Sequence, residues 1–347
     1  MAFEIIGTGR AAPARRVTND ELPKELETSD EWIRSHTGIG ARHLADDETA
    51  TSDLALEAAK NALAMAAGVD LSAGGAENAL AEAALSLDFI ILATTTPDFV
   101  GTPSTACIVQ DKLGAKRAGA LDITAACTGF VYGLELASGL LSMDRGRKRV
   151  LVICAETLSK FLDWTDRGSC VLFGDGAGAV VMEKTDAPME GQGRRGLIRT
   201  VIEADGSGAE YLFFSKGGSR NPFKAGESVD KPIHVVMNGQ AVYNFAVKAA
   251  TETIEEILSR EGISANDVAR IIPHQANARI VQAAAKRLKI PEEKFFLNIE
   301  EYANTSSASI PIAMDELNRN GKLRQGDLIL TVGFGGGLTY GANLIVW

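Results

Sequence analysis

The chain has 347 residues, of which 46% are apolar and 23% charged, and its mean hydropathy is +0.02. These values are typical of a soluble globular protein that is long enough for one large domain or two fused halves. The net charge of −10 argues against a general nucleic-acid surface, and an acidic protein partner would need a local basic patch.

Neither export nor a metal centre is indicated. No apolar run approaches the ~18 residues of a membrane span, and the N-terminus lacks a basic stretch followed by an apolar one. The four cysteines show no CxxC spacing, so we expect no disulfide framework and no zinc site. We therefore expect a cytoplasmic protein that is not embedded in a membrane.

Helical and strand patterns alternate along the first half of the chain. The expected elements are a helix over 52–67, a strand over 89–94, a helix over 104–113, a strand over 120–123, a helix from about 130, and strands over 150–154 and 171–183. The Ala-rich segment 71–87 is interpreted as a surface helix–loop insertion without chemistry.

The second half repeats this order of elements. Its expected elements are a helix over 241–260, a strand over 269–273, a helix over 276–288, a strand over 295–298, a helix after 304, and strands over 328–333 and 338–347. We therefore expect two related halves, 1–186 and 187–347, with mainly parallel sheets covered by helices. Ligands tend to bind at the carboxyl ends of such strands, where Cys127, His274 and Asn304 all fall.

Cys127 stands where an apolar strand runs into a helix. A small buried thiol is the usual fate of a cysteine. A helix N-terminus, however, presents free N–H groups and a positive dipole end, which favour a thiolate and a bound oxyanion. With Gly129 beside it, Cys127 is interpreted as a nucleophile.

His274 ends a buried type of strand and opens a helix, unlike the other three histidines. It is interpreted either as a structural histidine whose hydrogen bonds are satisfied at a strand end or, when paired with Cys127, as a catalytic group. A helix N-terminus lowers a histidine pKa, so the imidazole would be neutral and able to accept or donate one hydrogen bond.

Asn304 has two interpretations. It is suited to cap the helix that begins near Ser306. Its corner position, which matches that of Cys127 in the other half, favours an active-site role instead. There its amide would offer a neutral N–H donor to an enolate or an oxyanion.

Two glycine runs, 174–178 and 333–337, superficially resemble nucleotide loops. The second lies ten residues from the C-terminus, which leaves no helix or downstream acid for a dinucleotide fold. Glycine more plausibly lets the backbone pass close to the active site and aim an N–H at it. Gly336 is the expected donor.

The helix after His274 carries four basic residues, Arg279, Lys286, Arg287 and Lys289. The last three are typical of a solvated face. Arg279 lies one turn from the strand end, where it would meet a phosphate or a carboxylate-rich partner.

Together these motifs resemble the β-ketoacyl-acyl carrier protein synthase III family, over essentially the whole chain. The segments that carry the resemblance are IIGTG (5–9), TSDEWI (28–33), AACTGF (125–130), TDRG (165–168), FGDGAG (173–178), HQANAR (274–279), NTS (304–306) and FGGG (334–337). The resemblance implies a thiolase-like α/β fold, with two pseudo-duplicated halves in a five-layer α-β-α-β-α stack, and a homodimer.

It also implies a decarboxylating condensation that starts fatty acid synthesis. Cys127 would take the acyl group from an acyl-CoA, and the N–H groups of Cys127 and Gly336 would form the oxyanion hole. His274 and Asn304 would then stabilise the enolate formed from malonyl-acyl carrier protein. The CoA thioester is a substrate, and no cofactor is implied.

Several binding residues follow from the resemblance by position. Trp32 and Arg167 would hold the CoA adenine by stacking, and Asn277 would lie near the pantetheine. His36 replaces an arginine common near the CoA phosphates, and Thr102 replaces a partner-subunit aromatic at the floor of the acyl pocket, which hints at primers larger than acetyl. The carrier-protein contact would be Gln275, Ala276, Asn277, Ala278 and Arg279.

Three other functions are weighed against this one. The first is a thiolase-fold acyltransferase or condensing enzyme of secondary metabolism. A cysteine–histidine–asparagine thioester hydrolase fits the residues but not the doubled architecture. A carrier-protein-binding module without catalysis would be expected to lose Cys127 or His274.

Overall fold

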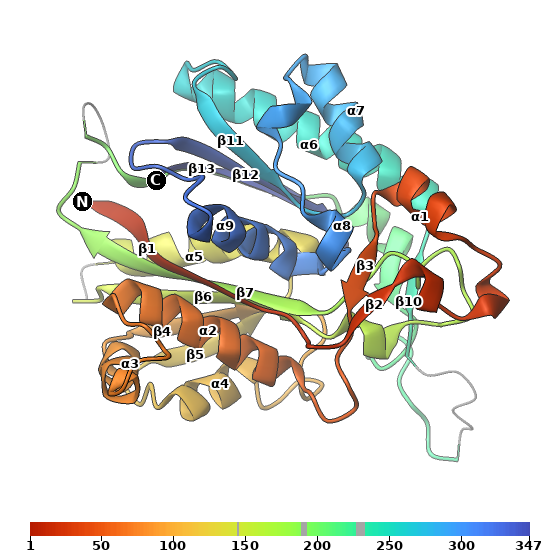
Figure 1. Ribbon diagram of the computed structural model, residues 1–347, viewed down its shortest axis with the longest axis horizontal. Helices are drawn as coiled ribbons and strands as arrows, with labels where there is room; N and C mark the ends of the chain where they lie inside the picture. The colour runs from red at the N-terminus through yellow and green to blue at the C-terminus, as the bar shows by residue number, and fades with distance from the viewer. Residues whose placement is uncertain (144–145, 189–192, 227–232) are drawn as a thin grey trace.

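Two sheets and three helical layers stack in the order α-β-α-β-α (Figure 1). The computed structural model describes residues 1–143, 146–188, 193–226 and 233–347. The predicted thiolase-like architecture is therefore confirmed. The division at 186/187 stays a prediction.

The first sheet has the strand order β1-β7-β6-β4-β5. Its strands are β1 (Ala2–Ala11), β4 (Phe89–Ala93), β5 (Gly119–Ile123), β6 (Arg149–Glu156) and β7 (Gly176–Thr185). Strand β4 pairs in parallel with β5 and β6, whereas β7 runs antiparallel to both β6 and β1.

The second sheet has the order β11-β12-β13-β8. Its strands are β8 (Gly196–Ala204), β11 (Val268–Pro273), β12 (Leu328–Gly335) and β13 (Thr339–Val346). Only the β11–β12 pair in this sheet is parallel. The prediction of mainly parallel sheets is thus wrong, because a link as short as 336–338 allows β13 to return only antiparallel to β12.

Two further expectations about strands differ from the structure. The segment 295–298 is not a strand: Phe295 forms a single bridge to Ile271, after a 3-10 turn, η6 (Glu292–Lys294). Strand β1 was not expected because glycines interrupt it. A Cβ on Gly9 would lie 2.3 Å from the Ala58 carbonyl oxygen, so glycine here permits close packing of β1 on a helix.

The helices fall into three layers (Figure 1). One outer layer contains α2 (Thr51–Ala67), α3 (Ala76–Leu85) and α4 (Thr105–Leu113), and the other contains α6 (Gly239–Glu261) and α7 (Ala278–Leu288). Between the sheets lie α5 (Gly129–Ser142) and α9 (Ser309–Arg319). Phe130, Leu134 and Ile310 from these two helices are fully buried in one core cluster with side chains of β6 and β12. Burial of this kind contributes about 1.5–3 kcal/mol for each large side chain.

The 71–87 segment is a helix–loop, as predicted. Its helix α3 packs on α2 through Ala83 and Ala84, and most of its other face is exposed.

Several shorter elements gather at one end of the two sheets, on the right in Figure 1. They are β2 (Arg16–Thr18), α1 (Asp30–Thr37), β3 (Ala41–His43), β9 (Leu212–Phe214), β10 (Val235–Met237) and α8 (Ile299–Tyr302). Side chains of these elements, such as Ile33, form a separate apolar cluster together with Leu158 and Phe173 from neighbouring segments.

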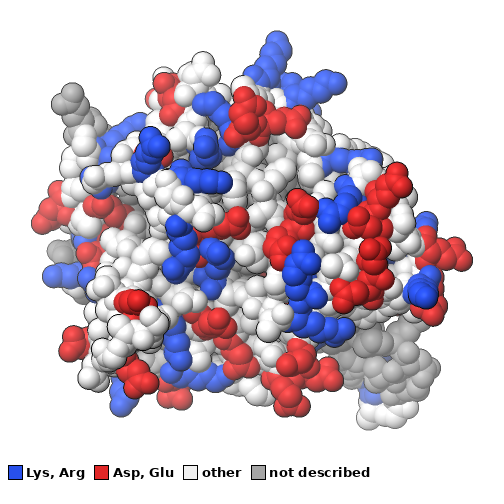
Figure 2. Space-filling view, in the orientation of Figure 1, with Lys and Arg blue, Asp and Glu red and all other residues white. Residues whose placement is uncertain are grey.

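The surface carries both signs of charge. Lysine and arginine alternate with aspartate and glutamate over the face in Figure 2, despite the net charge of −10. Among the described helices, none is long and apolar enough to cross a membrane.

Candidate active site

Cys127, His274 and Asn304 line one cavity of about 200 Å³, although they are far apart in the sequence. A second cavity, of about 250 Å³, also opens on Cys127. We call the first the entrance cavity and the second the acyl cavity. Cys127 therefore stands at the junction of two spaces.

Cys127 lies in a 3-10 turn, η3 (Ala126–Thr128), that runs directly into α5. The turn begins at Ala126, whose φ of 43° is in the left-handed region, so the backbone bends sharply beneath the thiol. Cys127 is 5% exposed, and its Sγ donates to Ser306 Oγ at 3.5 Å.

The thiol is not poised as a thiolate. The pKa of Cys127 is raised to about 12, chiefly by burial and also by the nearby Glu156, although the Ser306 hydrogen bond acts to lower it. The expectation that this corner favours a thiolate is therefore not supported, because burial shifts the pKa of the thiol upward.

His274 immediately follows β11, and its backbone N–H donates to the Val332 carbonyl at 2.7 Å. Its ring packs edge-on to Phe334, and Nδ1 lies 2.7 Å from Ser309 Oγ. His274 is 1% exposed, and this burial lowers its pKa to about 3. The imidazole is therefore neutral near pH 7, as expected, although α7 begins four residues later and burial is the cause.

Asn304 bonds the turn that follows it and also lines the entrance cavity, while its catalytic role stays a prediction. Its Oδ1 accepts from the Ser306 backbone N–H at 2.8 Å, immediately before a second 3-10 turn, η7 (Ser306–Ala308). Its backbone is held between Leu172 and Gly174. Because the amide oxygen is used in the turn, the amide nitrogen is left as the donor available to the entrance cavity.

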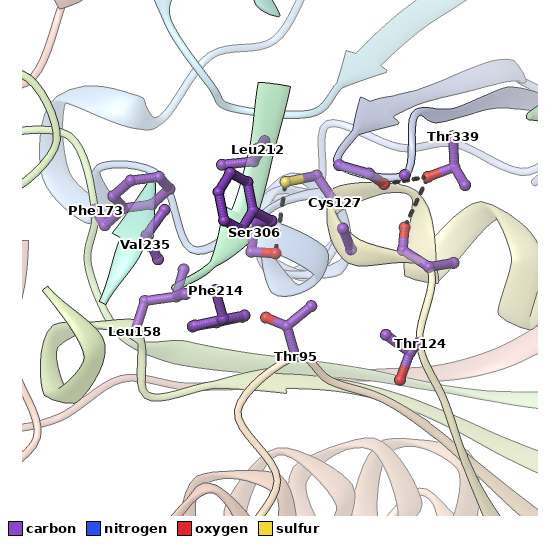
Figure 3. Close-up of a pocket in the computed structure, with 15 residues that line it drawn as sticks. Thr95, Thr124, Cys127, Leu158, Phe173, Leu212, Phe214, Val235, Ser306 and Thr339 are labelled. Atoms are coloured by element: carbon purple, nitrogen blue, oxygen red, sulfur yellow. Dashed lines mark hydrogen bonds between the residues drawn. The ribbon is translucent and has the colours of Figure 1, made fainter. Parts of the chain in front are cut away.

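The glycine run 333–337 closes over the nucleophile. A Cβ on Gly335 would lie 2.7 Å from Cys127 Cβ and 3.1 Å from its Sγ, so no side chain fits there. Gly336 lines the acyl cavity, and its carbonyl accepts from Thr339 Oγ1, which also donates to the Ala125 carbonyl (Figure 3). The role of Gly336 in an oxyanion hole stays a prediction.

The acyl cavity is walled mainly by apolar side chains from several elements (Figure 3). Its labelled lining includes Thr95, Leu158, Phe173, Leu212, Phe214 and Val235. Apolar walls with few polar groups suit a hydrocarbon chain.

Trp32 is 38% exposed and is contacted by His36 and Arg167, two of the three other residues predicted to bind CoA. The His36 ring stacks on it with a centroid distance of 4.3 Å, and Arg167 Cζ lies 5.4 Å from its ring centroid. Arg167 also donates to the Glu27 carbonyl at 2.8 Å. The three predicted nucleotide-binding side chains thus form one stack, and CoA binding there stays a prediction.

The segment 274–279 does not present all its side chains to solvent. Gln275 is 1% exposed, and its amide bonds the backbone of Pro273, Phe296 and Asn298. Its burial does not support the prediction that it contacts a carrier protein.

The rest of the segment lies nearer the surface. Ala276, Asn277 and Ala278 are partly exposed, and Arg279 is exposed. Ala276 and Asn277 line the entrance cavity. Asn277 Oδ1 caps α7, its Nδ2 donates to the His36 carbonyl, and Arg279 Nε donates to the Ser35 carbonyl. These contacts tie the rim of the entrance cavity to α1.

Thr102 lies on an exposed loop and is not among the described residues that line either cavity of its own chain. The same loop exposes Phe99 and Val100. A role for Thr102 in an acyl pocket would therefore require the partner subunit, and it stays a prediction.

The sequence analysis assigned no role to four residues that lie at the site. Ser306 and Ser309 bond Cys127 and His274, and Gly335 packs on Cys127. Glu156 is fully buried at the end of β6 and accepts from Thr94, Thr95, Thr96 and Ser307. Serines beside a capping asparagine and a glutamate ending an apolar strand carry no distinctive signal.

Metal binding has no described site. The described residues contain no group of three or more histidine, cysteine, aspartate or glutamate side chains placed to hold an ion.

Comparison with known proteins agrees with this geometry. Residues 121–206 match the family model for 3-oxoacyl-[acyl-carrier-protein (ACP)] synthase III, and residues 258–347 match the model for its C-terminal part. A β-ketoacyl-[acyl-carrier-protein] synthase III from Clostridium perfringens is 50% identical over 342 residues, which cover 99% of this chain and 98% of the relative.

Solved structures agree over the full length. The crystal structure of 3-oxoacyl-[acyl-carrier-protein] synthase III from Aquifex aeolicus is 42% identical, with a TM-score of 0.85 and complete coverage of both chains. A priming β-ketosynthase of a polyketide biosynthetic pathway is 31% identical, with a TM-score of 0.85 and coverage of 99% of this chain and 96% of that one. The chain therefore belongs to the β-ketoacyl-[acyl-carrier-protein] synthase III family.

Proposed function

We propose that Cys127, His274 and Asn304 catalyse the two half-reactions of a β-ketoacyl-[acyl-carrier-protein] synthase III, a condensing acyltransferase that initiates fatty acid biosynthesis. The substrates are an acyl-CoA primer and malonyl-acyl carrier protein. The observation that carries this assignment is the junction at Cys127, where an entrance cavity with two neutral polar groups meets an apolar cavity.

In the first half-reaction, Cys127 Sγ attacks the thioester carbonyl of the acyl-CoA. The backbone N–H groups of Cys127 and Gly336 hold the oxyanion, and the acyl chain enters the acyl cavity. The thiol proton ends on the departing CoA sulfur. Because the pKa of the free thiol is about 12, proton transfer accompanies attack rather than preceding it.

In the second half-reaction, the malonyl thioester occupies the entrance cavity. Its carbonyl oxygen accepts hydrogen bonds from Asn304 Nδ2 and His274, which stabilise the enolate formed as carbon dioxide leaves. The enolate carbon attacks the acyl-cysteine carbonyl, and the Cys127 sulfur departs and takes up a proton from water. Neutral donors suit this step because they lower the energy of the enolate without protonating it at carbon.

The remaining assignments concern binding. Trp32, His36 and Arg167 would hold the nucleotide end of CoA, and Asn277 its pantetheine. The carrier protein, an acidic partner, would approach Arg279 at the rim of the entrance cavity. A second copy of the chain would form a homodimer in the cytoplasm and bring Thr102 to its partner's acyl pocket. The proposal requires no cofactor.

The decisive experiment incubates the protein with acyl-CoAs of increasing length and branching together with malonyl-acyl carrier protein. Mass spectrometry then scores the acyl-enzyme and the products. We expect acylated Cys127 followed by a β-ketoacyl-carrier product. Free acid as the sole product would overturn the proposal in favour of a thioester hydrolase.

A second candidate is the priming of a different pathway, which the similarity to the priming polyketide β-ketosynthase favours. The chemistry would be the same, but the carrier protein would differ. Comparing condensation rates with carrier proteins of fatty acid and polyketide synthesis distinguishes the two.

A further inference from the structure

The segment 304–309 contacts all three proposed catalytic residues. Asn304 belongs to it, Ser306 Oγ accepts from Cys127, and Ser309 Oγ lies 2.7 Å from His274 Nδ1. The Asn304 amide nitrogen can only donate a hydrogen bond, and the Cys127 thiol has a single proton, so their contacts leave no choice of protonated atom. The contact to His274 differs, because a neutral imidazole has two tautomers and its partner decides which is favoured.

Ser309 has one hydroxyl proton and two neighbours able to accept it. One is His274 Nδ1 at 2.7 Å, and the other is the Ser306 carbonyl at 3.0 Å. The Ser306 carbonyl already accepts from the Ser309 backbone N–H. A lone pair of Ser309 Oγ is engaged by the Gln275 backbone N–H at 3.3 Å.

Two arrangements satisfy these contacts, and donation from Ser309 to His274 is the one that leaves the ring proton on Nε2. If the hydroxyl instead donated to the Ser306 carbonyl, that oxygen would accept twice and Nδ1 would have to carry the proton. The shorter distance is the one to Nδ1, and Ser309 is the hydrogen-bonding partner described for that nitrogen. Both residues are almost fully buried, so an unpaired ring nitrogen would cost about 1–3 kcal/mol.

We propose that Ser309 is a positioning residue for condensation: its hydroxyl donates to Nδ1 of His274 and so keeps the proton on Nε2. Nε2 is on the opposite side of the ring from Ser309, and His274 lines the entrance cavity. The Nε2–H then acts beside Asn304 as a second neutral donor to the enolate oxygen. With the proton on Nδ1, Nε2 would present a lone pair and repel that oxygen. This inference rests on the proposed function of His274.

The test replaces Ser309 by alanine, with Ser309→Thr to restore a hydroxyl. Ser138→Ala is the matched control, because Ser138 is a serine of the other central helix, α5, and its hydroxyl donates only to the backbone carbonyl of Glu135 among its described contacts. All proteins carry ¹⁵N-histidine, and the His274 ring resonances are identified by comparison with His274→Ala. Acylation and condensation are measured separately, the second by adding malonyl-acyl carrier protein to preformed acyl-enzyme.

We expect wild-type His274 to be protonated at Nε2 and unprotonated at Nδ1. In Ser309→Ala the two resonances should move toward each other as the tautomers mix, and condensation should slow by about tenfold, the scale of one lost hydrogen bond. Acylation of Cys127 should change less than about threefold, within the uncertainty of such small effects. Ser309→Thr should recover the wild-type tautomer and rate if it unfolds at the wild-type temperature, and Ser138→Ala should match wild type.

The inference about Ser309 would be overturned, and the proposed function would not, by a wild-type His274 that is protonated at Nδ1. An unchanged tautomer and condensation rate in Ser309→Ala would have the same consequence. Wild-type protein that acylates but never condenses would instead contradict the proposed function. A reduced rate with an unchanged tautomer would show that Ser309 acts only through packing, which also refutes the inference.

Discussion

Two corners, each a 3-10 turn that leads into one of the helices between the sheets, have the same backbone course but face different side chains. In one corner η3 runs into α5, in the other η7 runs into α9, and both turns begin at a residue with φ near 45°, Ala126 and Ser306. Counted along these turns, Cys127 corresponds to Ser307 rather than to Asn304. Strands β12 and β6, each eight residues long, end beside these corners with Gly335 and Glu156.

The difference lies in the residue opposite each corner. Gly335 leaves space in front of Cys127, and two cavities open there. Glu156 instead fills the corresponding space and accepts from Ser307 at 2.8 Å. The backbone design alone therefore does not make a reactive site; an absent side chain on the opposing strand does. The second corner serves as a rigid support for the first.

The largest difference should appear when the corresponding residue of each corner, Cys127 or Ser307, is replaced by alanine. Cys127→Ala should abolish acyl-enzyme formation, because among the described residues Cys127 is the nucleophile that lines both cavities. Ser307→Ala should leave Cys127 able to acylate, since Ser307 bonds Glu156 and the Ala93 carbonyl rather than the substrate spaces. Intact-protein mass after incubation with acyl-CoA measures both. Acyl-enzyme at a site other than Cys127 would contradict the assignment.

A smaller but still large loss is expected from filling the open corner. Gly335→Ala places a methyl group 2.7 Å from Cys127 Cβ, so the nucleophile must shift. A shift of about 1 Å at a reacting atom can cost roughly 100-fold in rate. Single-turnover acylation measures the effect. Gly139→Ala, on α5 with open space around it, is the control, and equal rates in the two variants would refute the steric argument.

Weakening the support corner should reduce stability more than rate. Glu156→Gln replaces an acceptor oxygen with an amide that faces hydroxyl donors, and the free energy of unfolding should fall by about 1–3 kcal/mol. The Cys127 pKa should also fall, because Glu156 raises it. Urea unfolding and the pH dependence of Cys127 alkylation, located by peptide mass, measure these changes. Exposed Glu77→Gln is the control, and unchanged stability in Glu156→Gln would contradict the prediction.

The last prediction concerns pH, and its effect is confined to acid conditions. His274 follows β11 as Thr94 follows β4, but only His274 titrates. Its pKa is lowered from 6.5 to about 3 in the folded state, so below 6.5 the unfolded chain takes up a proton that the folded chain refuses. Its contribution to stability is therefore complete above pH 6.5 and is lost as the pH falls toward 3. Unfolding free energies of wild type and His274→Gln between these values should converge at acid pH; parallel curves would refute this.

The sequence predicted the reactive corner better than the support corner. Cys127 and His274 were identifiable because each follows a strand that the periodic pattern reveals. Asn304 was reached through an expected strand over 295–298, whereas in the structure it follows the helix α8. Glu156 also ends a strand, but a single glutamate after an apolar run is equally typical of a solvent-exposed strand end. Its burial depends on donors from Ser307 and the threonines after β4, which only the folded chain brings together.

Strand direction and the state of the thiol were also beyond the sequence pattern. Alternating helices and strands predict parallel pairing, but β13 follows β12 after three residues and has no crossover. The pKa of Cys127 depends on how completely the corner is desolvated, a property of packing between the two sheets rather than of the segment around the cysteine.

The contact between Cys127 and Ser306 has a consequence for how the protein folds. The two residues are 179 positions apart, and Gly335 is farther still along the chain. Contacts of such long range form late, after the local helices and hairpins. Reactivity of Cys127 with acyl-CoA should therefore appear only when the second sheet has docked on α5 and α9. During synthesis the chain carries an unassembled nucleophile through most of its length, and the last strands complete its site.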